Sequence, residues 1–419
     1  MDQPQSERRL RSTPPPSDNP ITRSFERMIT QVRSRPLRGH VADYIPELAK
    51  ADAEAFAITA TSVSGHVYEA GDARTRFTIQ SISKPLVYAL ALGARGIDDV
   101  LGHVGVEPSG DAFNAISFDE RNRPANPLIN AGAVVTTSLI RAASADERFA
   151  TIRAGLSAFA GRDLEVDEAV YRSESATGDR NRALAMLARS FGVLECSVDD
   201  AVEPYFRQCA MSVDCTDLSV IGATLANDGE NPVTGHRVVS PVVARQTLSV
   251  MSSCGMYDRS GQWLFDVGMP AKSGVGGGIV AVAPGEYGIG VFSPPLDAAG
   301  NSSRGVMALR ALAEEFGLHL FNHPPRPTEP IAAITKDVPR GTMTLRMRGM
   351  IDFVAAEQIA YAVAEAMTDA SARTLVLDFA DATSITTVAA RLIIDLTAVA
   401  GSLHDRAVTV NDPAGLLRD

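Results

Sequence analysis

A serine and a lysine stand three residues apart in the stretch FTIQSISKP, residues 77–85. If a helix begins here, Ser81 and Lys84 lie on one face about one turn apart, and Ser83 is rotated off that face. A serine hydroxyl becomes a nucleophile when an adjacent base takes its proton, and a lysine is such a base only when neutral. Desolvation and the positive end of a helix both lower a lysine pKa. The spacing predicts acyl transfer at Ser81, with Ser83 dispensable; the alternative is an ordinary helix start, with Ser81 as a cap and Lys84 in solvent.

A second stretch that could serve acyl transfer is AKSGVGGG. Lys272-Ser273-Gly274, at the start of a predicted strand, resembles the Lys-Thr-Gly element of class A β-lactamases and penicillin-binding proteins. Such a strand presents backbone N–H groups to an acyl intermediate, and Val275 is placed to donate one. Taken alone, a Lys-Ser-Gly followed by glycines is more often a turn.

Residues for metal or histidine chemistry are poorly placed. The four cysteines form no CxxC pair and have no histidine at metal-ligand spacing, so we expect buried, reduced thiols; they are Cys196, Cys209, Cys215 and Cys254. The seven histidines are scattered, and none offers the base of a Ser-His-Asp triad. The sequence therefore predicts neither a metal site nor a cofactor, and this increases the weight given to Lys84.

Composition narrows the class of protein. The 419 residues are 45% hydrophobic and 21% charged, as in a globular protein, and suggest more than one domain. A net charge of −11 argues against nucleic acid or an anionic membrane as a partner. No apolar run reaches membrane-spanning length, and the N-terminus lacks the apolar core of a signal peptide. We therefore expect a cytoplasmic protein.

The predicted elements place the Ser81 segment beside a sheet. Residues 1–20 are polar and proline-bearing and predict a disordered tail. Two helices are expected next, an amphipathic one over 21–35 and a short one over 39–52 with Tyr44 near its start. An alternating hairpin over 56–68 then leads directly into Ser81.

Strand patterns return after a long helical region over about 85–251. Apolar strands are expected at 279–283 and 287–292, followed by a helix at 302–321. Strands at both ends can share one antiparallel sheet only by meeting in space. This predicts an α+β domain over 21–321 with a helical insertion.

A proline-rich linker over 322–340 is predicted to separate a second domain over 341–419. Its elements alternate as strand, helix, strand, helix and strand, which is typical of a small α/β domain. The expected ranges are 342–352, 355–367, 374–380, 386–401 and 407–412.

Seven motifs in order resemble the serine-dependent glutaminase family, over about residues 21–321. They are VADYIPELA, FTIQSISKP, NPLINAGAV, SESATGDRN, EPYFRQCAMSV, GMYDRSGQW and PAKSGVGGG. The resemblance implies a β-lactamase-like fold, hydrolysis of L-glutamine to L-glutamate and ammonia, and a homo-oligomer. One departure is Gly276, where the family pattern has serine.

The resemblance also implies residue roles. Ser81 is the expected nucleophile, Lys84 its base and Tyr257 a second proton-transfer group; the N–H groups of Ser81 and Val275 form the oxyanion hole. The remaining substrate-binding residues are expected to be Tyr44, Asn130, Glu174, Asn181 and Tyr205.

These residue types suit a free amino acid on their own terms. A carboxylate such as Glu174 can pair with an α-ammonium, while amides and tyrosine hydroxyls offer both donors and acceptors. Each one alone also has an ordinary explanation. Asn130 and Asn181 could be helix caps, Tyr205 could belong to the core, and Glu174 could be a solvated surface charge.

The C-terminal domain resembles STAS domains of the anti-sigma-factor antagonist type, through LRMRGMIDFVAAEQI and TLVLDFADATSITTVAARLI. Regulatory members carry an Asp-Ser pair at the start of the second helix, whereas this chain has Thr386 and Thr387. Thr387 is therefore expected to be a helix N-cap rather than a phosphorylation site. The resemblance implies a possible protein partner.

Two other functions fit parts of the pattern. A penicillin-interacting acyltransferase or β-lactamase would use the same serine and lysine, but its substrates lie outside the cytoplasm. A regulatory protein that senses glutamine would keep the binding residues and not need the catalytic ones. An intact Ser81, Lys84 and Tyr257 favours an active enzyme.

Overall fold

The computed structural model describes residues 20–37, 39–110, 116–322, 329–369, 372–403 and 407–417. The chain divides into two compact units, residues 1–322 and 323–419, which are described separately. Apart from Pro20, the predicted disordered tail lies outside the described residues, and so does most of the proline-rich stretch before Pro330.

The first unit is built on a five-stranded antiparallel sheet in the order β2-β1-β8-β7-β6. Strand β1 pairs with β8 from Ala57↔Phe292 to Ser62↔Tyr287. The prediction that strands from both ends of the segment meet in one sheet is therefore confirmed. The strands are β1 (Ala57–Ser62), β2 (Val67–Gly71), β6 (Ala271–Ser273), β7 (Gly278–Ala283) and β8 (Tyr287–Phe292).

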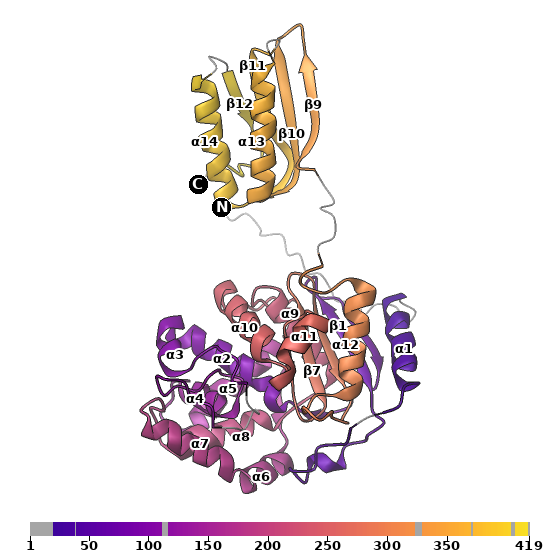
Figure 1. Ribbon diagram of the computed structural model, residues 1–419, viewed down its shortest axis with the longest axis vertical. Coiled ribbons are helices and arrows are strands. Elements are labelled where there is room, and N and C mark those ends of the chain that lie inside the picture. Colours follow the sequence, from indigo (N-terminus) through magenta and orange to yellow (C-terminus); the bar gives the residue numbers. More distant parts are fainter. Residues whose placement is uncertain are drawn as a thin grey trace, which may run out of the picture. The chain divides into compact units, whose positions relative to one another are not determined.

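Helices cover both faces of this sheet (Figure 1). Helices α1 (Pro20–Arg33) and α12 (Ser303–Phe316) pack on one face, and the apolar side chains of α1 are the ones that its spacing predicts. Helix α9 (Cys215–Ala226) lies on the other face, against β1, β7 and β8. The approach is close because a Cβ added at Gly288 would stand 1.9 Å from the backbone nitrogen of Ala223.

Most of the remaining helices form the insertion that the sequence predicts, on the side of the sheet opposite α12 in Figure 1. They are α2 (Ser83–Arg95), α3 (Ile97–His103), α4 (Asn130–Ser138), α5 (Ala145–Ala160), α6 (Glu168–Ala176), α7 (Asp179–Ser190), α8 (Val198–Cys209) and α10 (Pro241–Cys254). Helix α11 (Ser260–Asp266) follows the insertion, and its Trp263 packs in the same core as α1 and α12. Three short 3₁₀ turns accompany them: η1 (Leu48–Lys50), η2 (Gln80–Ile82) and η3 (Tyr257–Arg259).

A second, small three-stranded sheet in the first unit was not predicted. Its order is β3-β5-β4, with β3 (Phe77–Thr78), β4 (Glu165–Val166) and β5 (Met211–Val213). Strands of two or three residues are too short to give an alternating pattern. This sheet matters because β3 runs directly into the Ser81 segment.

The predicted short helix over 39–52 is wrong. The described part of this segment is irregular, with Tyr44 in a bend and only the turn η1 at Leu48–Lys50. Pro46 explains the difference, because proline disfavours helical conformation at the residue before it and has no N–H to donate. The segment is instead held by a bridge in which the backbones of His40 and Leu296 exchange hydrogen bonds of 3.2 and 2.8 Å.

The second unit is a four-stranded mixed sheet in the order β12-β11-β10-β9, with two helices packed on one face. Its elements are β9 (Ile331–Asp337), β10 (Thr342–Ile351), α13 (Phe353–Thr368), β11 (Thr374–Ile385), α14 (Thr387–Leu403) and β12 (Ala407–Asn411). Strand β9 lies inside the range predicted as linker. It was missed because it is a mostly exposed edge strand and so lacks an apolar alternation.

The start of α14 differs by one residue from the prediction. Thr387 is the first helical residue, and the hydroxyl of Thr386 accepts a 3.4 Å hydrogen bond from the backbone N–H of Ala389. Thr386, not Thr387, is therefore the N-cap. Among the described residues of either unit, no helix is both long and apolar enough to span a membrane.

Candidate active site

The Ser81 segment is held between the small sheet and helix α2. Ser81 lies in the turn η2, and Lys84 is the second residue of α2. The chain therefore tightens into a 3₁₀ turn before the α-helix begins, where the sequence predicts one continuous helix. Pairing of β3 with β5 and a 2.8 Å hydrogen bond from the N–H of Ile79 to the carbonyl of Met211 fix this segment.

Lys84, three residues after Ser81, is fully buried. Its Nζ donates a 2.6 Å hydrogen bond to Oδ1 of Asn130 and a 3.4 Å bond to the carbonyl of Leu128. Desolvation lowers its pKa to about 8, and the negative charge of Glu174 opposes that shift. The lowered pKa increases the share of neutral Lys84 near neutral pH, and the neutral amine can accept a proton.

Tyr257 connects the serine to a second lysine. The side chain of Ser81 is hydrogen-bonded to the Tyr257 hydroxyl, which itself donates a 3.1 Å bond to the carbonyl of Ser273. Burial raises the pKa of Tyr257, so the phenol stays protonated. Lys272 Nζ lies 4.1 Å from the centre of the Tyr257 ring and donates a 2.6 Å bond to the same carbonyl. Burial lowers the pKa of Lys272 well below its ordinary value.

The glycine-rich turn after β6 lies directly on the serine segment. A Cβ added at Gly274 would stand 2.9 Å from the carbonyl of Ile79, and one added at Gly276 would stand 2.7 Å from the carbonyl of Thr78. The glycine at 276, where the family pattern has serine, therefore permits close contact here. Val275, between these glycines, is buried in the same turn.

Ser81 opens into a cavity of about 330 Å³ that collects most of the predicted binding residues. Tyr44, which is 54% exposed, lines it together with Asn130, Glu174, Asn181 and Tyr205. These residues come from separate helices and a loop. Helix caps and core residues without a shared role would not be expected to meet in one cavity. The ordinary explanation that Glu174 is a solvated surface charge is wrong, because its exposed fraction is 7%.

Glu174 supplies a buried carboxylate to the lining of this cavity. Its Oε2 accepts a long 3.4 Å hydrogen bond from Nε2 of Gln80, and its side chain also contacts the thiol of Cys209. Burial raises its pKa to about 7, against the opposing effects of the Gln80 hydrogen bond and the Lys84 charge. A cationic group entering the cavity would favour the ionised carboxylate.

The amide and phenol groups form one connected set. Asn130 Nδ2 donates a 2.9 Å hydrogen bond to Oδ1 of Asn181, and the Tyr205 hydroxyl lies 3.4 Å from Oδ1 of Asn130. Asn130 also accepts from Lys84, so it joins the binding residues to the buried lysine. Such a set presents oriented donors and acceptors to a small polar ligand.

Three predicted residues do not line this cavity. Lys84 and Val275 are buried and are not among its lining residues, and Tyr257 lines a different cavity of about 410 Å³. The sequence reasoning in turn missed Gln80, Arg180 and Cys209, which do line the substrate-sized cavity. Gln80 and Arg180 stand next to Ser81 and Asn181, so position beside a predicted residue was the available signal.

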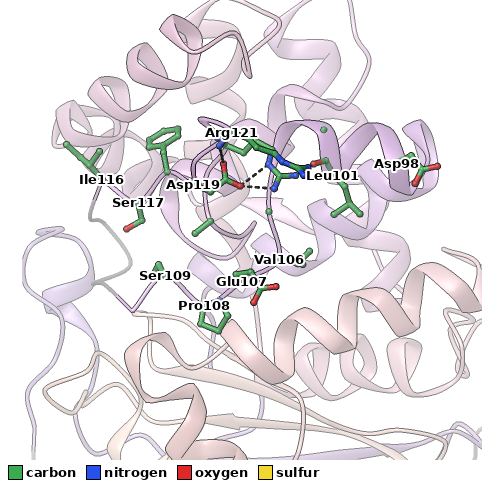
Figure 2. A pocket seen from close by; sticks show the side chains of 15 residues that line it. Asp98, Leu101, Val106, Glu107, Pro108, Ser109, Ile116, Ser117, Asp119 and Arg121 are labelled. Atoms are coloured by element: carbon green, nitrogen blue, oxygen red, sulfur yellow. Dashed lines mark hydrogen bonds and ion pairs between the residues drawn. The ribbon is translucent and has the colours of Figure 1, made fainter.

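A larger cavity of about 660 Å³ lies elsewhere in the first unit, around Asp119 and Arg123 (Figure 2). Two residues of its lining are joined by hydrogen bonds of 2.7 and 2.9 Å, which the Arg123 guanidinium donates to Asp119 Oδ2. None of the predicted catalytic or binding residues lines it. In the parts of the chain that the structure describes, no group of three or more His, Cys, Asp and Glu residues could hold a metal ion.

Comparison with known proteins places these residues in a family. The sequence model of the Glutaminase family matches residues 39–321. Glutaminase 1 of Bradyrhizobium diazoefficiens is 50% identical over 316 residues, which cover 74% of this chain and 51% of that relative. The glutaminase of Corynebacterium glutamicum is 43% identical over 376 residues, which cover 89% of this chain and 90% of that relative.

Solved structures agree with the sequence relatives. The crystal structure of Mglu in its glutamate form is 40% identical, with a TM-score of 0.84, and the match covers 94% of this chain and 99% of that one. This chain spans about half the length of Glutaminase 1 and Glutaminase 2 of Bradyrhizobium diazoefficiens, and most of the length of the Corynebacterium relative. With a family model over two thirds of its length and relatives of this identity, the chain belongs to the glutaminase family.

Proposed function

We propose that this protein hydrolyses L-glutamine to L-glutamate and ammonia through an acyl-enzyme on Ser81. The observation that carries the proposal is the 330 Å³ cavity in which the Ser81 hydroxyl and the buried Glu174 carboxylate face one small space. A nucleophile and a charge for an α-ammonium, held in one cavity, suit an amino acid with a side-chain amide. The named relatives are glutaminases, and the related Mglu structure is described in a glutamate form.

In the acylation step, Ser81 Oγ attacks the side-chain carbonyl carbon of glutamine. The serine proton passes to neutral Lys84 or by way of the Tyr257 hydroxyl, and the backbone N–H groups of Ser81 and Val275 donate to the oxyanion. The C–N bond then breaks, and the leaving nitrogen takes up the proton to depart as ammonia. Tyr257, hydrogen-bonded to Ser81, is placed to deliver it.

In the deacylation step, water attacks the acyl carbon and the bond to Ser81 Oγ breaks. The same groups return the water proton to the serine, and glutamate is released. Glu174 would pair with the α-ammonium of the substrate throughout. Tyr44, Asn130, Asn181 and Tyr205 would bind its carboxylate and amide.

A coupled ammonia assay tests the proposal. We expect release from glutamine and little from asparagine, none from either with Ser81→Ala, and no hydrolysis of nitrocefin. Glutamine binding without ammonia release would instead support a regulatory sensor. Nitrocefin turnover would support the β-lactamase alternative.

We also propose the finer assignments of fold and assembly. The antiparallel sheet with helices on both faces supports a β-lactamase-like fold for the first unit. The order strand, helix, strand, helix, strand after β9 supports a STAS-like second unit that takes a protein partner. A homo-oligomer is the expected assembly, which light scattering at several concentrations would test.

A further inference from the structure

Two residues that contact Ser81 have an unusual backbone. Among the described residues, four other than glycine have a positive φ: Gln80, Asn122, Asp228 and Tyr257. Asn and Asp tolerate this left-handed conformation, whereas a glutamine does so rarely. Gln80, with φ of +50°, directly precedes the nucleophile, so some contact must hold it there.

The hydroxyl of Ser83 supplies such a contact. Ser83 Oγ donates a 2.8 Å hydrogen bond to the carbonyl of Gln80, and both side chains are buried, with exposed fractions of 0% and 3%. This bond closes the turn η2 across Ser81. The backbone N–H of Ser83 donates to the same carbonyl, so the hydroxyl is its second donor, and removing the hydroxyl weakens the hold on the turn without leaving the carbonyl unpaired.

The Ser83 hydroxyl is itself held by a chain of buried donors. Gln208 Nε2 lies 3.4 Å from Ser83 Oγ, and Thr137 Oγ1 lies 3.0 Å from Gln208 Oε1. Gln208 and Thr137 have exposed fractions of 0%. They belong to α8 and α4, the helices that also carry Tyr205 and Asn130, so substrate-binding helices and catalytic turn share one network.

The side chain of Gln80 connects the turn to Glu174 in the cavity. Its Nε2 lies 3.2 Å from Thr78 Oγ1 and 3.4 Å from Glu174 Oε2. A change in the Gln80 backbone would therefore move Ser81 and release Glu174 together.

We propose that Ser83 is a positioning residue, whose hydroxyl holds Gln80 in the left-handed conformation that aims Ser81 and steadies Glu174. This inference rests on the role proposed above for Ser81. It differs from the expectation of the sequence alone, in which Ser83 is dispensable because it lies off the Lys84 face.

The test compares Ser83→Ala with Ser219→Ala. Ser219 is also fully buried and donates a 2.8 Å bond to the carbonyl three residues before it, but it lies in α9 with Thr61 as its other partner. Both variants should lose similar thermal stability. Only Ser83→Ala should lower kcat for glutamine, by about tenfold or more, because small displacements of reacting groups are costly.

Repeating Ser83→Ala in a Gln80→Gly variant tests whether Ser83 acts through the Gln80 backbone or only fills space in the core. Glycine adopts positive φ freely, so in Gln80→Gly the turn no longer needs the Ser83 hydroxyl. Adding Ser83→Ala to Gln80→Gly should then lower kcat by less than about threefold, a coupling that a double-mutant cycle measures. An unchanged kcat in Ser83→Ala, or equal losses in both backgrounds, would overturn the inference.

Labelling of Ser81 gives a readout that does not depend on glutamine. Diisopropyl fluorophosphate should form an Oγ–P bond with release of fluoride, detected by intact mass and absent in Ser81→Ala. Ser83→Ala should slow this labelling about tenfold, and Ser219→Ala should not. Ser83→Cys, which keeps the size but donates weakly, should be intermediate and covers the case in which Ser83→Ala does not fold. If the parent protein labels at Ser81 without releasing ammonia from glutamine, the proposed function fails while the labelling rates still decide the role of Ser83.

Discussion

Lys84 is fully buried, and this environment determines when it can act as a base. Its pKa of about 8 lies below the ordinary lysine value because desolvation disfavours the ammonium. Deprotonation activates it, so kcat/KM should rise with pH through about 8, until loss of the proton from the substrate α-ammonium, the partner of Glu174, lowers it again at higher pH. Lys84→Arg should abolish turnover at every pH, since a guanidinium does not deprotonate in proteins.

The pKa of Lys84 also depends on the charge of Glu174. Because the charge of Glu174 raises the Lys84 pKa, Glu174→Gln should shift the rising limb of kcat to lower pH. Stopped ammonia assays with saturating glutamine between pH 5.5 and 9.5 would measure the shift. A limb that moves to higher pH, or that persists unchanged in Lys84→Arg, would show that another group titrates.

Glu174 should determine preference for a free α-amine. Removing one partner of a buried charge pair costs on the order of 2–5 kcal/mol, so Glu174→Gln should lower kcat/KM by about 30-fold to several thousand-fold. N-acetylglutamine should be a poor substrate for the parent protein. Glutamine and N-acetylglutamine would be compared in both proteins, and equal use of the two by the parent would remove this role from Glu174.

Residue spacing and motif order predicted only part of the candidate site. The interval from Ser81 to Lys84 predicted a reactive serine, and the motif order singled out residues that the cavity gathers. The left-handed backbone of Gln80 and the contact of Lys84 with Asn130 were not predictable. Both arise from tertiary contacts between segments that are distant in the sequence.

At the scale of elements, long periodic patterns predicted well and short ones did not. Helix α1 and the hairpin β1–β2 follow from strong periodicity and burial. The segment with Tyr44 has apolar residues at helical spacing, yet Pro46 and the bridge to Leu296 keep it irregular. Strand β9 is stabilised by pairing with β10 rather than by a buried face of its own.

The contact of α9 with the sheet gives a prediction at this scale. Gly288→Ala should destabilise the first unit by at least about 1–3 kcal/mol, because the new Cβ would overlap the backbone of Ala223. Gly93→Ala is the matched control. Gly93 lies within α2, and an added Cβ would meet nothing within 4 Å, so alanine should stabilise the helix by up to about 1 kcal/mol. Thermal melting that shows no loss in Gly288→Ala would contradict the tight packing.

The whole molecule combines two units with separate cores. The first buries its sheet between α1 and α12 on one face and α9 on the other, while the second has its own cluster around Leu345, Leu377 and Phe379. Composition and the run of prolines predicted a division near residue 322, and the structure divides there. The matches to the Corynebacterium relative and to Mglu are both longer than the first unit, so they extend into the second.

This organisation predicts that a chain ending at Asn322 folds and keeps its substrate preference. Every candidate catalytic and binding residue precedes that point, and the last residues are anchored by backbone hydrogen bonds of 3.0 Å from Leu320 to Gly268 and 2.8 Å from Asn322 to His319. A unit of this size buries enough surface to be stable alone. A chain ending at Asn301 is the control, because it removes α12 and its buried Leu309 and Leu312 and should not fold. Melting curves and ammonia release from glutamine and asparagine would be compared with the full chain.

An inactive or insoluble chain ending at Asn322 would mean that the second unit is required for the first to fold. Activity equal to that of the full chain would leave the second unit to modulate or localise the enzyme through a partner.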